Sequence, residues 1–224
     1  MLAWECEQFE HAVGDIFGFH ALQLGLPELN TLEANRIPHQ WLGCEVWPNP
    51  SLQQRKVLLT HSMALPFADA SLDLMTLPHS LELSADPHAT LREVARVLVP
   101  EGRVVITGFN PASLWGVKNS LGAEMPKVSD WIGYWRLRDW LQLLSFDVEV
   151  STFGCYRPAA KKQQWLNRWA WMDRAGARWW RIFGAVYCVV AVKRVRGMRL
   201  LEPAWKTNKA TQARTVPTVS KRMK

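Results

Sequence analysis

The sequence contains few cysteines and no motif that would pair them. Cys6, Cys44, Cys155 and Cys188 lie far apart, and none of them forms a Cys-x-x-Cys pair. A disulfide framework or a structural zinc site would require closely and regularly spaced ligands. We therefore expect reduced, mostly buried thiols and no structural metal.

The sequence also lacks a long hydrophobic run and a Gly-x-Gly-x-x-Gly loop. Its longest nearly uncharged apolar stretch, residues 182–192, is about half as long as a helix that crosses a bilayer, so we expect no membrane span. The missing loop argues against a nicotinamide-dependent oxidoreductase, because that loop cradles the pyrophosphate of the cofactor. The first seven residues carry acids where a signal or transit peptide would carry bases, which predicts a cytoplasmic protein.

Positive charge is scarce in most of the chain and concentrated in its last part. The formal net charge is +7, yet residues 193–224 hold ten Lys and Arg against one acid, Glu202. The residues before them are therefore net acidic. This break in composition predicts a folded domain over residues 1–193 and a basic, disordered tail over residues 194–224. Such a tail could neutralise the phosphates of a nucleic acid, or it could be a solvated extension that aids solubility.

Short β-like runs alternate with helical patterns before the tail. The expected strands lie at residues 20–25, 40–46, 56–61, 72–77, 103–108, 147–153 and 185–192. Amphipathic helices are expected from Asp86 to a stop at residues 100–102, over residues 130–144, and over residues 160–183. This alternation is typical of an α/β fold, in which helices cover both faces of a mostly parallel sheet.

The clearest βαβ unit spans residues 71–108. Its first strand ends at Pro78, which supplies no N–H to a sheet. Asp86 is placed to cap the following helix, and Pro87 stands at the first helical position, where its missing N–H costs nothing. The apolar face of this helix is expected to consist of Leu91, Val94, Ala95 and Leu98.

Several motifs in residues 61–110 follow one another in the order found in a known family. They are Leu65-Pro-Phe67, Ser71-Leu-Asp73, Arg96-Val-Leu-Val-Pro-Glu-Gly102 and Val104-Val-Ile-Thr-Gly108. This stretch resembles class I S-adenosylmethionine-dependent methyltransferases, and more narrowly their type 11 group. Residues 108–116 and the basic tail are also similar to a small group of uncharacterised bacterial methyltransferase-like proteins. The resemblance implies a Rossmann-like, mostly parallel sheet with helices on both faces and a late antiparallel strand.

The resemblance also implies S-adenosylmethionine as the cofactor. In this family the first strand ends in a Gly-x-Gly loop, an acid after the second strand binds the ribose, and an Asp after the third strand meets the adenine amine. Here one glycine of that loop remains, Pro27 stiffens the turn, and a histidine stands where the Asp is expected. Glu33 is an alternative ribose acid in another register. The residues expected to border the cofactor are Gly25, Glu45, His61, Met63 and Pro78.

Two polar residues follow the strands that should end nearest to the chemistry. His79 could act as a general base for an acceptor that must lose a proton, or it could be a loop histidine bonded to its neighbours. Asn110, with Trp115, could orient an acceptor, or it could form an Asn-Pro turn beside a packed aromatic ring. Ser80 and Glu82 are interpreted as structural.

The helix expected over residues 160–183 is rich in tryptophan and arginine. It contains Trp165, Trp169, Trp171, Trp179 and Trp180 among Arg168, Arg174, Arg178 and Arg181. Packing on the sheet is the ordinary interpretation, and a membrane surface or stacked bases are alternatives. The leading hypothesis is a methyltransferase acting on an unidentified acceptor. The alternative is a catalytically inactive methyltransferase-like module that binds RNA, an anionic surface or a protein partner.

Overall fold

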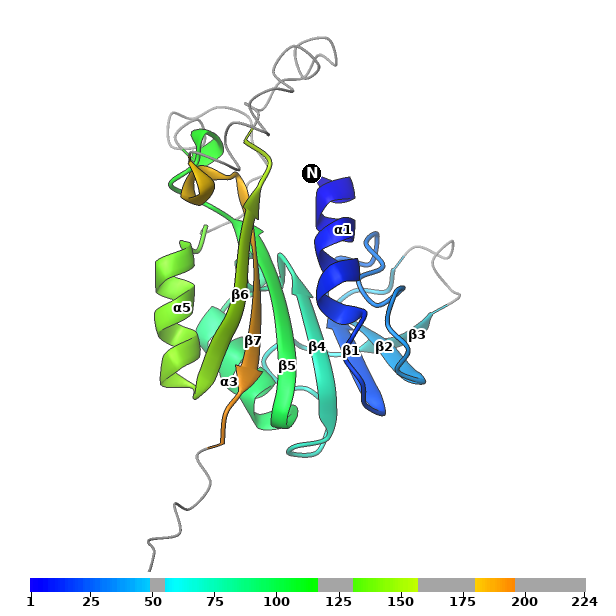
Figure 1. Ribbon diagram of the computed structural model, residues 1–224. Coiled ribbons are helices and arrows are strands. Elements are labelled where there is room, and N and C mark those ends of the chain that lie inside the picture. Colours follow the sequence, from blue (N-terminus) through cyan, green and yellow to red (C-terminus); the bar gives the residue numbers. More distant parts are fainter. Residues whose placement is uncertain (49–54, 117–130, 157–179, 196–224) are drawn as a thin grey trace, which may run out of the picture.

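The computed structural model describes residues 1–48, 55–116, 131–156 and 180–195, which form a seven-stranded sheet (Figure 1). The strands are β1 (His20–Leu24), β2 (His39–Cys44), β3 (Lys56–Leu59), β4 (Leu72–Pro78), β5 (Leu98–Phe109), β6 (Phe146–Gly154) and β7 (Val186–Lys193). Their order across the sheet is β3-β2-β1-β4-β5-β7-β6.

Most of the strand pairs are parallel. β1 pairs with β2 and β4, β2 with β3, and β4 with β5, all in parallel, whereas β7 runs antiparallel to both β5 and β6. This arrangement confirms the predicted fold class, including the late antiparallel strand. Because parallel strands finish at the same side of a sheet, β1, β2, β4 and β5 share one edge, which we call the carboxyl edge.

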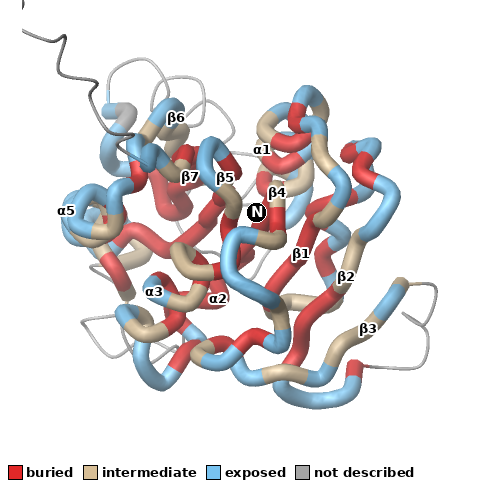
Figure 2. Tube along the Cα trace, turned by 90° about the horizontal axis from the view of Figure 1, so that it is seen from below, coloured by how far each residue is buried: buried red, intermediate tan, exposed pale blue. Residues whose placement is uncertain are grey.

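Helices cover both faces of the sheet. α1 (Leu2–Val13) buries Phe9 and Val13 against one face, together with Val105 and Cys188. α2 (Ser80–Leu83), α3 (Pro87–Val97) and α5 (Tyr134–Leu143) contribute buried side chains to the cluster on the other face. Figure 2 shows buried chain between α1 on one side and α2 and α3 on the other.

The helix α3 begins as the sequence predicts and ends earlier. The Asp86 side chain accepts a hydrogen bond from the Ala89 N–H at 3.0 Å, and Pro87 is the first helical residue. The helix ends at Val97 rather than at residues 100–102, because Leu98 already pairs with Leu72 as the first residue of β5. The strand expected at residues 103–108 therefore begins earlier, at Leu98.

Other expectations differ from the structure or lie outside its described residues. α1 is not among the helices expected from the sequence. Residues 160–179 of the helix expected over residues 160–183 lie outside the described residues. The last part of that range contains a 3-10 helix, η2 (Arg181–Phe183). The tail also lies outside the described residues from residue 196 on. The four cysteines form no disulfide with one another. Within the described ranges, no helix is both long enough and apolar enough to span a membrane.

Candidate cofactor site

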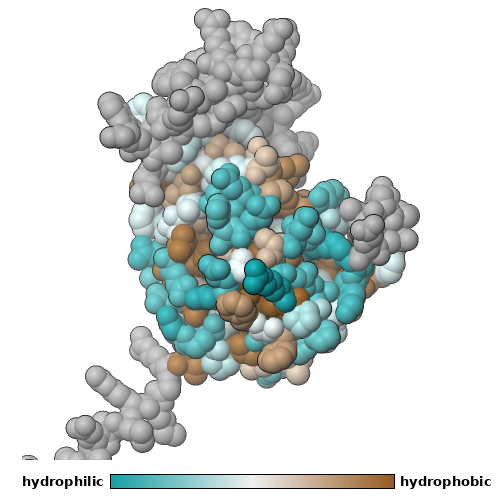
Figure 3. Space-filling view, turned by 45° about the vertical axis from the view of Figure 1, so that its right-hand side comes forward, coloured by the Kyte–Doolittle hydropathy of each residue, from teal (hydrophilic) through white to brown (hydrophobic). Residues whose placement is uncertain are grey.

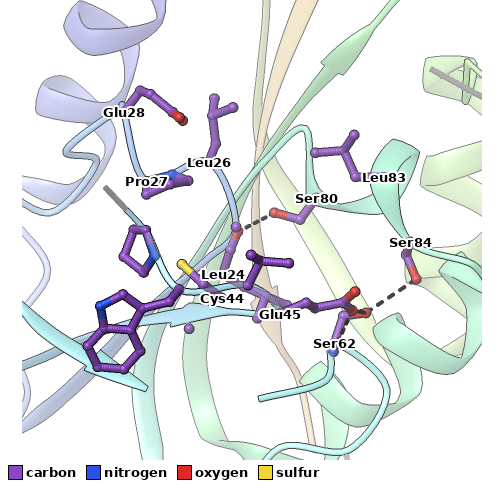
Figure 4. Close-up of a pocket in the computed structure, with 15 residues that line it drawn as sticks. Leu24, Leu26, Pro27, Glu28, Cys44, Glu45, Ser62, Ser80, Leu83 and Ser84 are labelled. Atoms are coloured by element: carbon purple, nitrogen blue, oxygen red, sulfur yellow. Dashed lines mark hydrogen bonds between the residues drawn. The ribbon is translucent and has the colours of Figure 1, made fainter. Parts of the chain in front are cut away.

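A cavity of about 380 Å³ opens at the carboxyl edge, within the size range of small-molecule sites (Figure 4). The end of β1, the loop that follows it, the end of β2 and the segment after β4 form its wall. The lining residues are those at 24–28 and 43–48 together with Ser62, Ser80, Leu83 and Ser84. The cavity thus lies where ligands bind in open parallel sheets, outside the carboxyl ends of the strands.

A buried glutamine within β1 fixes the loop that follows this strand by hydrogen bonds. Gln23 Nε2 donates to the carbonyls of Gly25, Leu26 and Leu29, at 3.2, 3.0 and 2.7 Å. Its Oε1 accepts from the backbone N–H and the hydroxyl of Thr31, and from the guanidinium of Arg55. The side chain therefore joins three loop carbonyls, Thr31 and Arg55 to the buried strand, and it fixes the path of the turn.

Gly25 stands where the chain must bend away from the sheet. Its φ is +74°, a conformation that L side chains rarely adopt, and a Cβ there would lie 3.1 Å from Ser80 Oγ. Ser80 Oγ donates to the Leu24 carbonyl, so it links the ends of β1 and β4. Leu26 and Pro27 lie in the cavity wall, and their side chains leave the cavity open.

An acidic group follows β2 on the opposite wall. Glu45 Oε1 accepts from Ser62 Oγ at 3.0 Å and from the Ser62 N–H at 3.3 Å. His61 Nδ1 lies 3.2 Å from the same oxygen, and both side chains are about half exposed or more. Three groups thus orient one carboxylate oxygen, and the carboxylate remains at the cavity wall. Glu33, the alternative ribose acid, is exposed and outside that wall.

His79 belongs to a buried cluster with two carboxylates. Its Nδ1 lies 2.9 Å from Glu82 Oε2, and its Nε2 lies 3.2 Å from Glu5 Oε1 on α1. Burial acts to lower the pKa of His79, but the hydrogen bonds and charges of Glu5 and Glu82 outweigh it and raise that pKa to about 9. Burial also raises the pKa of Glu82 against the opposing effect of His79. Both ring nitrogens contact carboxylates, which disfavours a general base and favours a fixed cation.

Asn110 holds two segments together at the end of β5. Its Nδ2 donates to the carbonyls of Ile182 and Gly184, at 2.6 and 3.0 Å, and its Oδ1 accepts from the Ala112 N–H at 3.1 Å. The side chain is 3% exposed, and it is not part of the cavity wall. These contacts match the turn that was the alternative interpretation of Asn110.

The structure brings together only some of the residues expected at the cofactor. Gly25 and Glu45 both line the cavity, and His61 contacts Glu45 from beside it. Met63, half-buried, and Pro78, buried at the end of β4, are not part of the wall. Sequence reasoning missed the lining residues Glu28, Cys44, Trp47, Ser62 and Ser84, and it interpreted Ser80 as structural only. The position of Ser62, directly after the expected third strand, was the signal available for it.

The cavity combines a polar wall with an apolar one. Glu45 and the hydroxyls of Ser62, Ser80 and Ser84 offer hydrogen bonds, while Leu26, Val46, Trp47 and Leu83 offer flat or aliphatic surface. In the described residues, no group of three or more His, Cys, Asp and Glu is arranged to hold a metal ion. This arrangement suits a ligand that carries adjacent hydroxyls and a flat ring.

Comparison with known proteins shows that much of this site falls in a range that matches a known protein domain. A family model described as "Methyltransferase domain" matches residues 27–106, a range that includes Glu45, Ser62 and Ser80. A curated relative, the uncharacterized protein YafS of Escherichia coli (strain K12), is 39% identical over 139 residues. That match covers 59% of this chain and 55% of the relative, so the chain spans about half the length of the curated relative it matches.

Solved structures share the fold at low sequence identity. An S-adenosylmethionine-dependent methyltransferase from Archaeoglobus fulgidus aligns with a TM-score of 0.62 at 17% identity, over 86% of this chain and 95% of that one. One from Thermotoga maritima aligns with a TM-score of 0.61 at 14% identity, over 86% and 91%. One from Mesorhizobium loti aligns with a TM-score of 0.60 at 13% identity, over 86% and 100%.

Proposed function

We propose that this chain, which has the fold of the class I methyltransferases, binds S-adenosylmethionine in the cavity at the carboxyl edge and transfers its methyl group to an acceptor. The observation that carries the proposal is the open cavity with Glu45 in its wall. A first loop with a single glycine would be expected to obstruct the cofactor, yet the loop, fixed by Gln23, lines a cavity that is open beside it. The methyltransferase domain match over residues 27–106 supports the same activity.

The residues of the wall fit the parts of that cofactor. The Glu45 carboxylate, oriented by Ser62, is suited to accept hydrogen bonds from the two ribose hydroxyls. Val46 and Trp47 offer apolar surface for the adenine ring, and Gly25 allows the backbone of the first loop to approach the methionine part. When bound, the cofactor supplies a methyl group on a sulfonium, and the protein's task is to align it in line with the acceptor atom.

Four further assignments belong to this proposal. We place His79 as a fixed cation below the site, and Asn110 as a positioning residue for the segment over β5. We keep a cytoplasmic location, which is consistent with cysteines that form no disulfide with one another. A nucleic-acid partner for the basic tail also stays a prediction, supported by the charge of residues 193–224.

Calorimetric titration of the full chain with S-adenosylmethionine and S-adenosylhomocysteine tests the proposal. We expect saturable binding of both, and we expect Glu45→Gln to weaken it at least tenfold, because an amide accepts ribose hydroxyls less well than a carboxylate. Glu33→Gln is the matched control and should leave the affinity unchanged. Absence of heat at millimolar ligand would overturn the enzyme assignment and favour the catalytically inactive binding module.

A further inference from the structure

A buried carboxylate lies on the inner face of α1. Glu5 is 0% exposed, whereas the charged side chains of folded proteins ordinarily meet water, and much of the face in Figure 3 is hydrophilic. The helix packs on β5 and β7, and none of its residues, all of which the structure describes, lines the cavity. Glu5 is therefore placed to affect a ligand in the cavity only through another residue.

Packing alone gives no reason for a carboxylate at this position. Among the described residues, the hydrogen-bond partner of Glu5 Oε1 is His79 Nε2 at 3.2 Å, and the other oxygen, Oε2, is buried without a hydrogen bond. A buried ion pair with an unsatisfied oxygen commonly stabilises a fold less than an apolar residue of similar size would. The contact with His79 is therefore what distinguishes Glu5 from an apolar residue.

His79 has a backbone conformation that its neighbours must hold in place. Its φ is +52° and its ψ is 12°, in the left-handed region that few residues other than glycine adopt without cost. Its ring lies between Glu5 on α1 and Glu82 on α2. Glu82 Oε1 in turn accepts from the Phe109 N–H at the end of β5. Two carboxylates from different elements thus fix both nitrogens of the ring.

The residue after His79 begins the part of the cavity wall that α2 supplies. Ser80, Leu83 and Ser84 all line the cavity, and Figure 4 shows Ser80 linked by a hydrogen bond to the end of β1. Because α2 has only four residues, and because His79 at its N-cap makes no side-chain cap bond, the helix does little to fix its own orientation. The direction of α2 therefore depends on the conformation of His79.

We infer that Glu5 is a positioning residue for the cavity: it holds the His79 ring, and His79 in turn holds α2 in the cavity wall. The effect on cofactor binding rests on the proposed function, whereas the coupling of α1 to α2 rests on the contacts alone. Breaking the contact should release the wall residues of α2 and leave those on β1 and β2 in place.

Hydrogen–deuterium exchange of the full chain without ligand tests the coupling. Glu5→Met removes the contact, places an apolar residue on the inner face of α1 and leaves His79 paired with Glu82, so the protein should fold. The amides of residues 79–84 should then exchange at least tenfold faster. Glu5→Gln, which can still accept a hydrogen bond from the ring, should accelerate their exchange less than fivefold.

Val13→Ala is the matched control, because it weakens the packing of α1 at another fully buried position and leaves the charged contact intact. In this variant the amides of residues 79–84 should exchange within threefold of the unchanged protein. Equal acceleration in Val13→Ala and Glu5→Met, or none in Glu5→Met, would overturn the inference. If Glu5→Met does not fold, Glu5→Gln is compared with Val13→Ala in the same way, and equal exchange in those two has the same meaning.

Calorimetric titration of the same variants with S-adenosylhomocysteine tests the consequence for the cavity. Glu5→Met should bind at least fivefold more weakly than the unchanged protein, Glu5→Gln should lie between the two, and Val13→Ala should stay within twofold. A general loss of stability would weaken binding in Val13→Ala as well, and it would not be relieved by the conservative change to glutamine. Unchanged affinity in Glu5→Met would contradict the positioning role.

The outcome is separable from the fate of the proposed function. If the unchanged protein binds no S-adenosyl ligand, the methyltransferase proposal fails, and the exchange of residues 79–84 still decides whether Glu5 holds α2. Ordinary exchange in Glu5→Met, with saturable cofactor binding in the unchanged protein, would overturn the role of Glu5 alone.

Discussion

Gln23 is the single residue on which the shape of the first loop depends most. It is fully buried in β1, and its amide contacts three carbonyls and Thr31 within the loop and Arg55 outside it. Glycines allow a loop to turn by conformational freedom, whereas here a side chain fixes the turn by hydrogen bonds. In this chain the fixed turn leaves a cavity at the ends of β1 and β2.

Replacing Gln23 by methionine tests this role. Gln23→Met keeps the length of the side chain and removes all of its buried hydrogen bonds to the loop, so the free energy of unfolding should fall by about 2–4 kcal/mol. The affinity for S-adenosylmethionine should fall at least tenfold in variants that are still folded at the assay temperature. Gln142→Met, on the exposed side of α5, should change the unfolding free energy by less than about 0.5 kcal/mol. Normal affinity in folded Gln23→Met would contradict the role.

The buried cluster of Glu5, His79 and Glu82 predicts a pH dependence of stability. The pKa of His79 is raised in the folded protein to about 9 from 6.5. The stabilisation is therefore complete below pH 6.5 and is lost as the pH rises through about 9, a loss of up to about 3 kcal/mol. Denaturant unfolding between pH 6 and 10 measures it. Glu5→Gln should reduce the slope, and an unchanged slope in that variant would show that the cluster does not couple α1 to His79.

At the scale of elements, pattern and burial explain which predictions succeeded. The strand at residues 72–77 was predictable because four of its six residues are Leu or Met and it is bounded by Pro78, and every position except Asp73 is buried. The helix after Asp86 was predictable because its cap and its apolar face agree. α1 was not identified, since its buried positions are Glu5, Phe9 and Val13, and a charged residue on the inner face breaks the apolar pattern. The partner of Glu5 is His79, which is distant in sequence and could not be found from the local pattern.

Asn110 links the segment that follows β5 to the segment that precedes β7. Asn110→Ala removes the contacts to Ile182, Gly184 and Ala112 and should lower the free energy of unfolding by about 2–3 kcal/mol, with cofactor affinity changed less than twofold. Asn30→Ala, at an exposed loop position, is the control and should stay within about 0.5 kcal/mol. Unchanged stability in Asn110→Ala would instead favour the acceptor-orienting role that the sequence suggested.

For the whole molecule, the sequence predicted the sheet better than the site. The order of short strands and helices determines an α/β architecture, and the motifs at residues 61–110 select one version of it. The cavity wall depends on contacts between residues far apart in sequence, such as Glu45 with Ser62 and Ser80 with Leu24. No local pattern records those contacts, so only Gly25 and Glu45, which follow strands directly, were found in the wall.

The division into a domain and a tail can be tested by two truncations. A chain that ends at Val195 keeps all of β7 and the contact of the Arg194 N–H with the Ser145 carbonyl, so its melting temperature should stay within about 2 °C of the full chain. A chain that ends at Ala185 loses β7, which lies between β5 and β6 and contributes the buried Tyr187, and it should show no cooperative melting. Loss of cooperative melting in the longer chain would mean that residues 196–224 belong to the folded domain, because a solvated extension contributes no packing to the sheet.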